Sequence, residues 1–452
     1  MGLRKILFVS TAFVGLSAML AGSGSDHSPN LRPQPNPHGA AQTFSGAGYI
    51  NLGSKFFKSL GTNERTCGTC HSESDGWTVT PEHVQARFES SQGTDPIFRT
   101  NDGSVCSTAD VSTVEARRNA YSMLLSKGLI RVQIGVPANA EFVVENIDDP
   151  YVCATPDALS LFRRPLPATN LRFLTTVMWD GRESPKGRSL HDSLMSQAID
   201  ATTGHAQGLA PTGKDVEDII AFEMGLTTAQ FWDNSLGALN SHGANGGAMA
   251  LSKQEFYTGI NDPLGGNPTG AAFDPTVFRI YSNWSNEHYG GEGSEMREAV
   301  SRGEAIFNTR PIPITGVAGL NDELHAPVIN GTCTTCHDSP NVGNHSVPLP
   351  INIGLVGEDR RTPDLPLYTL RCVATGEIFK VTDPGRALIT GKCKDIGKFK
   401  GPVLRGLASR APYFHNGSAA TLRDAVDFYD ARFNLNLTEQ DKSDLVAFLQ
   451  TL

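Results

Sequence analysis

The sequence of 452 residues predicts a mostly α-helical fold, built from two similar halves in tandem and extended by long loop insertions. Three repeated features predict this architecture. The motif CxxCH occurs twice, as CGTCH at 67–71 and as CTTCH at 333–337. Before each copy, a helical segment carries a glycine four residues ahead of a phenylalanine, as LGSKFF at 52–57 and RGEAIF at 302–307. A late amphipathic helix follows each motif, so the two halves share one order of elements.

The N-terminus has the pattern of a secretory signal peptide. Arg4 and Lys5 precede an apolar run over 6–21 that is too short and too interrupted for a comfortable membrane span. We therefore predict a signal peptide over 1–22, a periplasmic location and no stable membrane span in the mature chain, with an uncleaved anchor as the alternative. Residues 23–45 are rich in proline and are expected to form an extended, poorly ordered tether.

Both CxxCH motifs have the spacing of covalent haem attachment. On a helix, residues i, i+3 and i+4 share one face, so two thiols can add to the haem vinyl groups while the histidine reaches the iron. A single copy would equally suit a redox dithiol or a zinc site, but two copies in an exported chain favour two covalently bound haem c groups. The residues concerned are Cys67, Cys70 and His71 in the first half, and Cys333, Cys336 and His337 in the second.

Four cysteines lie outside the motifs. An exported chain folds in an oxidising compartment, where disulfides are the default state of such cysteines. The pairings Cys106–Cys153 and Cys372–Cys393 each stay within one half of the chain, and they are the pairings that we expect. Free thiols and a crossed pairing are the alternatives that the sequence leaves open.

Each half is predicted to be one cytochrome c-like domain. Small c-type cytochromes pack their first and last helices together beside the haem, and amphipathic late helices are predicted at 215–226 and 441–452. The domains are assigned to 46–275, with the first haem, and to 276–452, with the second. Chance similarity between amphipathic helices is the alternative. An insertion that includes 132–147 is expected to contain short strands.

Together with the two haem motifs, MWDGR at 178–182 and APYFHNG at 411–417 resemble the superfamily of bacterial di-haem cytochrome c peroxidases and MauG. RRPLPATN at 163–170 is also similar to the segment that precedes WDGR in that superfamily. The resemblance implies that the N-terminal haem activates hydrogen peroxide and that the C-terminal haem stores or relays electrons. It further implies that Trp179 lies between the haems and shortens the electron-transfer path, with a core aromatic as the alternative.

The same resemblance implies a calcium ion near the domain interface, because the superfamily usually binds one there. Asn170 and the backbone carbonyl groups of Arg410 and Pro412 are the residues at the corresponding places. Oxygen atoms of this kind are the hard ligands that calcium prefers.

The sequence departs from the superfamily at the peroxide site. The superfamily follows WDGR with a glutamine and, ten residues later, a glutamate that moves protons. Here Gln197 follows after an insertion, and Gln207 takes the later place. An amide can hydrogen-bond peroxide but cannot accept its proton, so His205 is the predicted acid–base group, with an ordinary loop residue as the alternative. Residues 84–190 contain no histidine, which predicts a first haem open to peroxide.

The second haem is predicted to bind a tyrosine. A capping box at 421–424 starts a helix whose spacing directs Tyr429 to the buried face. Peroxidases of the superfamily carry a methionine ligand fourteen residues after the histidine of the PYFH-type motif, whereas MauG has a tyrosine there. Fourteen residues after His415 comes Tyr429, so His337 and Tyr429 are the predicted iron ligands. A core tyrosine, with His415 or His345 as the ligand, is the alternative.

These features predict an exported di-haem c-type peroxidase that reduces hydrogen peroxide at the first haem with electrons relayed from the second. The electrons would come from a small redox protein, either a cytochrome c or a cupredoxin. Two rival functions stay open: a MauG-like oxidase that modifies a protein partner, and a di-haem electron carrier without catalysis. A net charge of −9 argues against nucleic acid as a partner.

Overall fold

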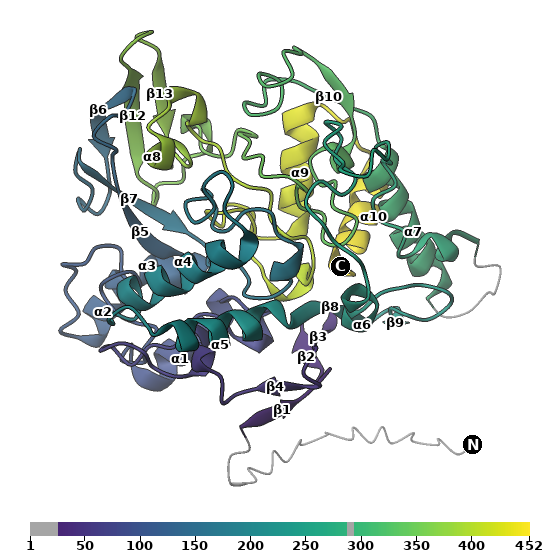
Figure 1. The fold of residues 1–452 in the computed structure, drawn as a ribbon, viewed down its shortest axis with the longest axis horizontal. Coiled ribbons are helices and arrows are strands. Elements are labelled where there is room, and N and C mark those ends of the chain that lie inside the picture. The colour runs from purple at the N-terminus through teal and green to yellow at the C-terminus, as the bar shows by residue number, and fades with distance from the viewer. Residues whose placement is uncertain (1–25, 287–292) are drawn as a thin grey trace, which may run out of the picture.

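The computed structural model describes residues 26–286 and 293–452 as helices, short strands and loops (Figure 1). The helices are α1 Pro81–Ser91, α2 Val114–Ala120, α3 Ser122–Lys127, α4 Leu190–Gly204, α5 Gly213–Met224, α6 Ala248–Ser252, α7 Ser294–Thr309, α8 Ala387–Thr390, α9 Leu422–Phe433 and α10 Glu439–Gln450. The strands are β1 His27–Pro29, β2 Gln34–Asn36, β3 Gly39–Ser45, β4 Tyr49–Asn51, β5 Ile130–Gly135, β6 Phe142–Asp148, β7 Ala158–Arg163, β8 Leu226–Asp233, β9 Gly237–Ala238, β10 Ile312–Ile314, β11 Ile329–Gly331, β12 Leu367–Cys372 and β13 Ile378–Val381.

The predicted mostly α-helical fold is wrong, because helices account for only 30% of the structure and strands for 18%. Segments that contain β-branched and aromatic residues, such as β8 and β12, pair as strands that the sequence analysis did not predict. The expected helix at 52–57 forms only a 3₁₀ turn over Lys55–Phe57. The short strands expected within 132–147 are confirmed as β5 and β6.

The N-terminal segment is not a loose tether. Residues 1–22, the predicted signal peptide, lie outside the described residues, but from His27 onward the chain forms strands. β3 pairs antiparallel with β8 along its whole length, and β1 pairs with β4. The prolines of this segment fall at strand ends and in the short strand β2, where a missing N–H is tolerated. The segment therefore covers part of the first half.

The last helix packs against the helix that precedes the second CxxCH motif. α7 and α10 cross at Gly303, where an added Cβ would lie 2.0 Å from the carbonyl oxygen of Asp444. Only glycine allows this approach, which explains the glycine four residues before Phe307. Phe307 and Phe448 then pack in one apolar core with ring centroids 5.7 Å apart. A separate core around the first motif joins Phe56 to Phe222 of α5, with centroids 4.8 Å apart.

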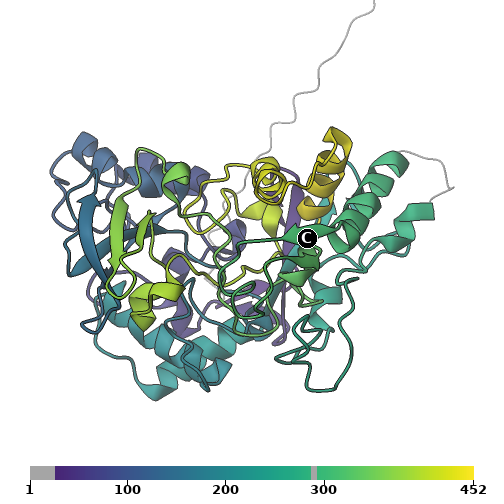
Figure 2. The same ribbon diagram turned by 90° about the horizontal axis from the view of Figure 1, so that it is seen from above.

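Strands from the two halves also pair with each other. β12 lies between β13 and β6 in an antiparallel sheet, so residues 142–148 and 367–372 are neighbours. Seen from above, this sheet and the α7–α10 pair lie at opposite ends of the molecule (Figure 2). Within the described residues, no helix combines the length and the apolar character needed to cross a bilayer.

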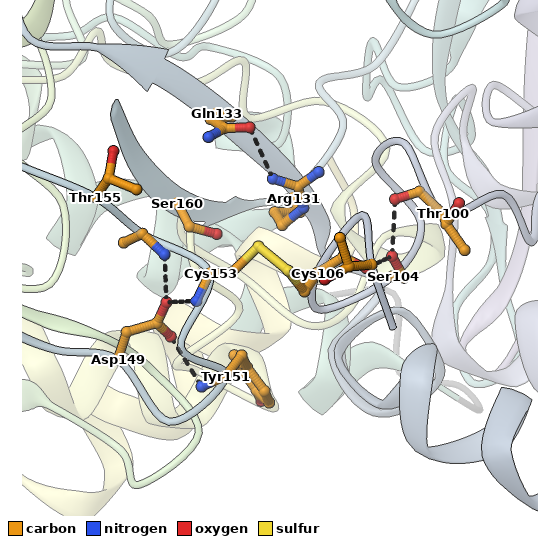
Figure 3. Close-up of a disulfide and its surroundings, with 12 residues drawn as sticks. Thr100, Ser104, Cys106, Arg131, Gln133, Asp149, Tyr151, Cys153, Thr155 and Ser160 are labelled. Atoms are coloured by element: carbon orange, nitrogen blue, oxygen red, sulfur yellow. Dashed lines mark hydrogen bonds between the residues drawn. A yellow bond between two sulfur atoms is a disulfide. The ribbon is translucent and has the colours of Figure 1, made fainter. Parts of the chain in front are cut away.

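Both predicted disulfides are confirmed. Cys106 bonds to Cys153, and Cys372 bonds to Cys393. Figure 3 shows the first bond beside Asp149, whose carboxylate accepts hydrogen bonds from the backbone N–H groups of Tyr151 and Cys153. The disulfide and this carboxylate together fix the loop between β6 and β7.

A repeated segment lies where the two halves meet. Residues 164–181 and 400–417 share a pattern of 3₁₀ turns and left-handed residues at a constant separation of 236 residues (164 to 400, 179 to 415), although only the second segment has a cis bond, at Ala411–Pro412. The left-handed residues correspond pairwise: Asn170 with Gly406 (φ 60° and 68°), Met178 with Phe414 (67° and 66°), and Gly181 with Gly417 (70° and 64°). The 3₁₀ turns Leu171–Phe173 and Leu407–Ser409 correspond in the same way.

The two segments are joined by reciprocal hydrogen bonds. The backbone N–H of Arg164 donates to the carbonyl oxygen of His415 at 2.7 Å, and the backbone N–H of Lys400 donates to the carbonyl oxygen of Trp179 at 2.9 Å. Because the same two positions are joined in both directions, the segments are related by a local two-fold axis.

Candidate haem sites

Both CxxCH motifs have nearly the same local structure. Each starts as a 3₁₀ turn, Cys67–Thr69 in the first half and Cys333–Thr335 in the second. Threonines before and within each turn form a reciprocal capping box, which fixes the turn. All four motif cysteines are outside the two disulfides, so their thiols are available for haem attachment.

The histidines of the motifs are oriented for iron binding. Nδ1 of His71 lies 3.0 Å from the carbonyl oxygen of Trp77, and Nδ1 of His337 lies 2.5 Å from that of Gly343. A carbonyl oxygen can only accept, so Nδ1 carries the proton and Nε2 keeps its lone pair for a metal. Burial lowers the pKa of both imidazoles, to about 4 for His337, which keeps them neutral. The donor set therefore fits covalent haem at both motifs.

The first cavity, which contains Cys67, Cys70 and His71, also holds two of the three predicted distal residues. Gln197 of α4 and His205, which directly follows α4, both line it. Gln207 does not; it is solvent-exposed, and its side-chain oxygen accepts a weak hydrogen bond from Asn63 at 3.4 Å. The structure thus brings His205 and Gln197 together and leaves Gln207 outside.

A buried carboxylate orients His205. Asp102 accepts a hydrogen bond from Nδ1 of His205 and forms an ion pair with Arg65. Burial by itself would raise the pKa of Asp102, but the Arg65 guanidinium and the bond to His205 outweigh it, so that pKa lies below its ordinary value. An ionised Asp102 holds the proton of His205 on Nδ1 and leaves Nε2 as the basic atom. The sequence carries no signal for Asp102, which lies 103 residues before His205.

Glu223 is a further residue of the first cavity that the sequence analysis missed. It lies on the buried face of α5, and its Oε2 atom has no hydrogen-bond partner among the described residues. Burial raises the pKa of Glu223 to about 8, so the carboxyl group is mainly protonated at neutral pH. The first cavity therefore holds two groups able to exchange protons.

The second cavity contains Cys333, Cys336, His337 and Tyr429. The capping box of Thr421 and Asp424 is confirmed as the start of α9, which directs Tyr429 inward. Burial, and then the neighbouring cysteine thiols, raise the pKa of Tyr429. A phenolate at this place therefore needs a cationic partner, such as ferric iron.

The two competing histidines have other surroundings. His345 is absent from the cavity lining and forms a buried pair with Asp338, with Nδ1 2.9 Å from the carboxylate. His415 lines the same cavity as Tyr429, but its ring stacks on Phe399 with centroids 4.2 Å apart. The Nε2 atom of His415 has no hydrogen-bond partner among the described residues, so Tyr429 stays the predicted ligand and His415 its alternative in the same cavity.

Trp179 lies against His415 at the meeting point of the two halves. Its indole N–H donates to the carbonyl oxygen of Arg164 at 2.8 Å, which fixes the ring. Trp179 lines the second cavity but not the first, whereas Pro165 lines both. The indole is therefore close to the second haem site, and Pro165 joins the two cavities.

Two of the oxygen atoms assigned to calcium, on Asn170 and Arg410, already accept hydrogen bonds from the protein. The side-chain oxygen of Asn170 accepts from the N–H of Thr228 at 3.0 Å, and its amide donates to the carbonyl oxygen of Thr228 at 2.9 Å. The carbonyl oxygen of Arg410 accepts from the guanidinium of Arg164 at 3.1 Å. Across residues 26–286 and 293–452, no group of three histidine, cysteine or acidic side chains could hold a metal ion. Calcium at Asn170, Arg410 and Pro412 stays a prediction.

Sequence comparisons identify similar peroxidases. The chain is 29% identical over 206 residues to cytochrome-c peroxidase IdrP1 of Pseudomonas sp. (strain SCT), a match that covers 40% of this chain and 47% of the relative. It is 32% identical over 121 residues to cytochrome c551 peroxidase of Nitrosomonas europaea, covering 26% of this chain and 30% of the relative. The chain thus spans about half or less of the curated relatives it matches. No family model matches the chain.

A solved structure titled as a MauG-like protein associated with microbial copper homeostasis aligns with 94% of this chain and 92% of its own, at 17% identity and a TM-score of 0.40. That likeness is too weak to carry an argument about function. The curated matches show that the chain is similar to bacterial cytochrome c peroxidases over part of its length.

Proposed function

We propose that this protein is an exported di-haem peroxidase that reduces hydrogen peroxide at the first haem. The observation that carries the proposal is the pair of His205 and Asp102 in the cavity of Cys67, Cys70 and His71. A basic imidazole nitrogen held beside a haem pocket is what proton transfer to and from peroxide requires. The similarity to bacterial cytochrome c peroxidases supports the same reaction.

The side chains divide the proton work. Reduction of hydrogen peroxide to two water molecules consumes two electrons and two protons. Nε2 of His205 takes a proton from one peroxide oxygen and gives it to the other, while Asp102 keeps Nδ1 protonated and stabilises the imidazolium. Gln197 binds peroxide through its amide. The haem, held by His71, supplies the iron that binds peroxide and exchanges electrons with it.

Electrons would reach this site from the second haem, bound by Cys333, Cys336, His337 and Tyr429, with Trp179 on the path. The domains that hold the two haems are proposed as 46–275 and 276–452. Each motif has its own apolar core, but the core of the second also includes Leu236 and Leu239, and the core of the first also includes Val403. A small cytochrome c or cupredoxin in the periplasm would supply the electrons.

Tyr429 favours a second candidate function. A phenolate is a hard anionic donor that stabilises oxidised iron, which suits a MauG-like oxidase that takes electrons from a protein partner instead of from a small redox protein. The two candidates share the peroxide site and differ only in the electron donor. A carrier without catalysis would have no use for the His205–Asp102 pair.

The test is the reaction of the resting protein with hydrogen peroxide, followed by stopped-flow absorbance. We expect His205→Ala to slow the reaction ~10²–10⁴-fold, because it removes the acid–base group. The control is His191→Ala, since His191 lies at the start of α4, the helix that ends just before His205, is exposed and pairs with Glu217 on the surface. Equal rates in the two variants would remove the proposed role of His205, and unchanged spectra after peroxide addition would favour the carrier.

A further inference from the structure

Three buried cations line the second cavity without any carboxylate partner. They are Arg164, Lys400 and Arg410, with exposed fractions of 5%, 7% and 8%. Within residues 26–286 and 293–452, none of them forms an ion pair. A buried charge without a counter-charge is costly, so each of these residues needs compensation from something else.

Backbone carbonyl groups compensate the two guanidinium groups. Arg164 donates to the carbonyl oxygens of Lys127 and Val79, both at 2.7 Å. Arg410 donates to those of Gly406 at 3.1 Å and Val403 at 2.8 Å. Both guanidinium groups are thus held in place, but their positive charges are not neutralised.

Lys400 has no such compensation. Its ammonium group makes no hydrogen bond in the described part of the chain, and it lies near Arg410. Burial, and then the charge of Arg410, lower the pKa of Lys400 to about 8. Lys398 shows how a buried lysine is normally satisfied here, since it is 3% exposed and pairs with Asp322 at 3.5 Å and Asp395 at 3.4 Å. The difference is that Lys400 faces the cavity and Lys398 does not.

The lining of the second cavity indicates which kind of anion could balance the charge of Lys400. At one place it contains the thiols of Cys333 and Cys336, where the haem is attached, and much of its wall is aliphatic or aromatic. A ligand that is apolar over most of its surface and carries carboxylates at one edge matches this arrangement. Haem is such a molecule, because its two propionate groups lie on one side of the ring.

We propose that Lys400, with Arg410 beside it, binds the propionate carboxylates of the second haem. This inference rests on the second haem of the proposed function. The lining of the cavities makes it specific to one haem, because Lys400 and Arg410 line the cavity of Cys333 and Cys336 and do not line the first cavity. The ammonium of Lys400 then raises the affinity of the second haem for an electron, since a nearby positive charge favours the ferrous form.

The test is a spectroelectrochemical titration of the haem-loaded protein. We expect Lys400→Met and Lys400→Gln to lower the reduction potential of the second haem by about 59 mV. For one electron, this corresponds to a roughly tenfold rise in the ferric-to-ferrous ratio at a fixed applied potential. The first haem should keep its potential. Lys400→Arg should restore most of the shift, because it restores the charge. Lys398→Met is the matched control and should leave both potentials unchanged.

Two further measurements distinguish a wrong propionate assignment from a wrong di-haem function. A pyridine haemochrome assay counts the haems, and resonance Raman spectra report the propionate groups through their bending modes, which should move in Lys400→Gln. Two haems with unchanged potentials and unchanged bending modes in the Lys400 variants would overturn the propionate assignment alone. Fewer than two haems in the unaltered protein would instead overturn the di-haem function on which it rests.

Discussion

The indole of Trp179 lies edge-on to the imidazole of His415, with ring centroids 6.1 Å apart and planes inclined by 66°. These residues occupy the same position in the two repeated segments. Each accepts, through its carbonyl oxygen, the N–H of the basic residue that opens the other segment, Arg164 or Lys400. The contact between the halves is therefore built from two copies of one structural unit, and the chemistry differs only in the side chains. One copy supplies an indole and the other an imidazole, whose pKa burial lowers to about 4.

Replacing Asp102 tests whether it positions His205. We expect Asp102→Asn to slow the reaction with hydrogen peroxide by ~10²-fold, because the amide cannot hold the proton on Nδ1 as a carboxylate does. Stopped-flow absorbance measures the rate, with Asp95→Asn as the control because it removes an ion pair to Arg87 outside the cavity. A rate equal to that of the control would make Asp102 purely structural.

The carboxylate of Asp102 also predicts how the stability of the fold changes as the pH falls. The pKa of Asp102 is lower in the folded protein than its ordinary value of 3.8, so its stabilisation is present above pH 3.8 and is lost as the pH falls through the folded value. When the pH falls below 3.8, the free energy of unfolding of Asp102→Asn should therefore decrease less than that of the unaltered protein. Acid unfolding followed by circular dichroism checks the difference, and parallel curves would contradict it.

Glu223 is expected to change the stability of the fold with pH in the opposite direction to Asp102. Its pKa is about 8 in the folded protein against an ordinary 4.5, so it destabilises the fold progressively as the pH rises from 4.5 to 8. Over this window Glu223→Gln should gain stability relative to the unaltered protein by up to about 1.4 kcal/mol for each pH unit. Denaturant unfolding at pH 5, 6.5 and 8 measures the difference. Glu217→Gln, an exposed change on the same helix, is the control, and a constant difference across the three pH values would contradict the prediction.

The sequence predicted the chemistry better than the architecture, for a physical reason. The sequence displays short local patterns directly, and these include the CxxCH motifs and the capping box before Tyr429. The disulfide pairs were predicted from the expected oxidising compartment and from pairing within each half. The sheet of β6 and β12 depends on pairing between residues more than 200 positions apart, which no local pattern shows. For the same reason Asp102 and Glu223 were missed, since only the fold brings them to the first cavity.

The calcium prediction stays open to experiment. Asn170 occupies the expected position, but its amide is used to hold the backbone of Thr228. We therefore expect a calcium chelator to leave the thermal unfolding temperature and both haem spectra unchanged. Differential scanning calorimetry with and without EDTA makes the measurement. A fall in unfolding temperature that added calcium reverses would show that the ion binds after all, and an Asn170→Ala variant would then identify whether this residue is a ligand.

Tyr429→Phe tests the predicted ligand of the second iron. Phenylalanine keeps the aromatic ring in the cavity of Cys333, Cys336 and His337 but removes the oxygen, so the low-spin signal of this haem should change in the electron paramagnetic resonance spectrum. Its reduction potential should rise, since an anionic oxygen donor stabilises the ferric form and phenylalanine does not.

Tyr413→Phe is the matched control for this experiment. Tyr413 lines the same cavity, but its hydroxyl donates to the carbonyl oxygen of Leu407 at 2.9 Å, so its loss should leave the iron spectrum as it was. If both variants keep the spectrum and potential of the unaltered protein, Tyr429 is a core residue, and His415 becomes the remaining candidate within that cavity. If only Tyr429→Phe changes them, the ferric-stabilising phenolate is established and the MauG-like alternative gains its strongest support.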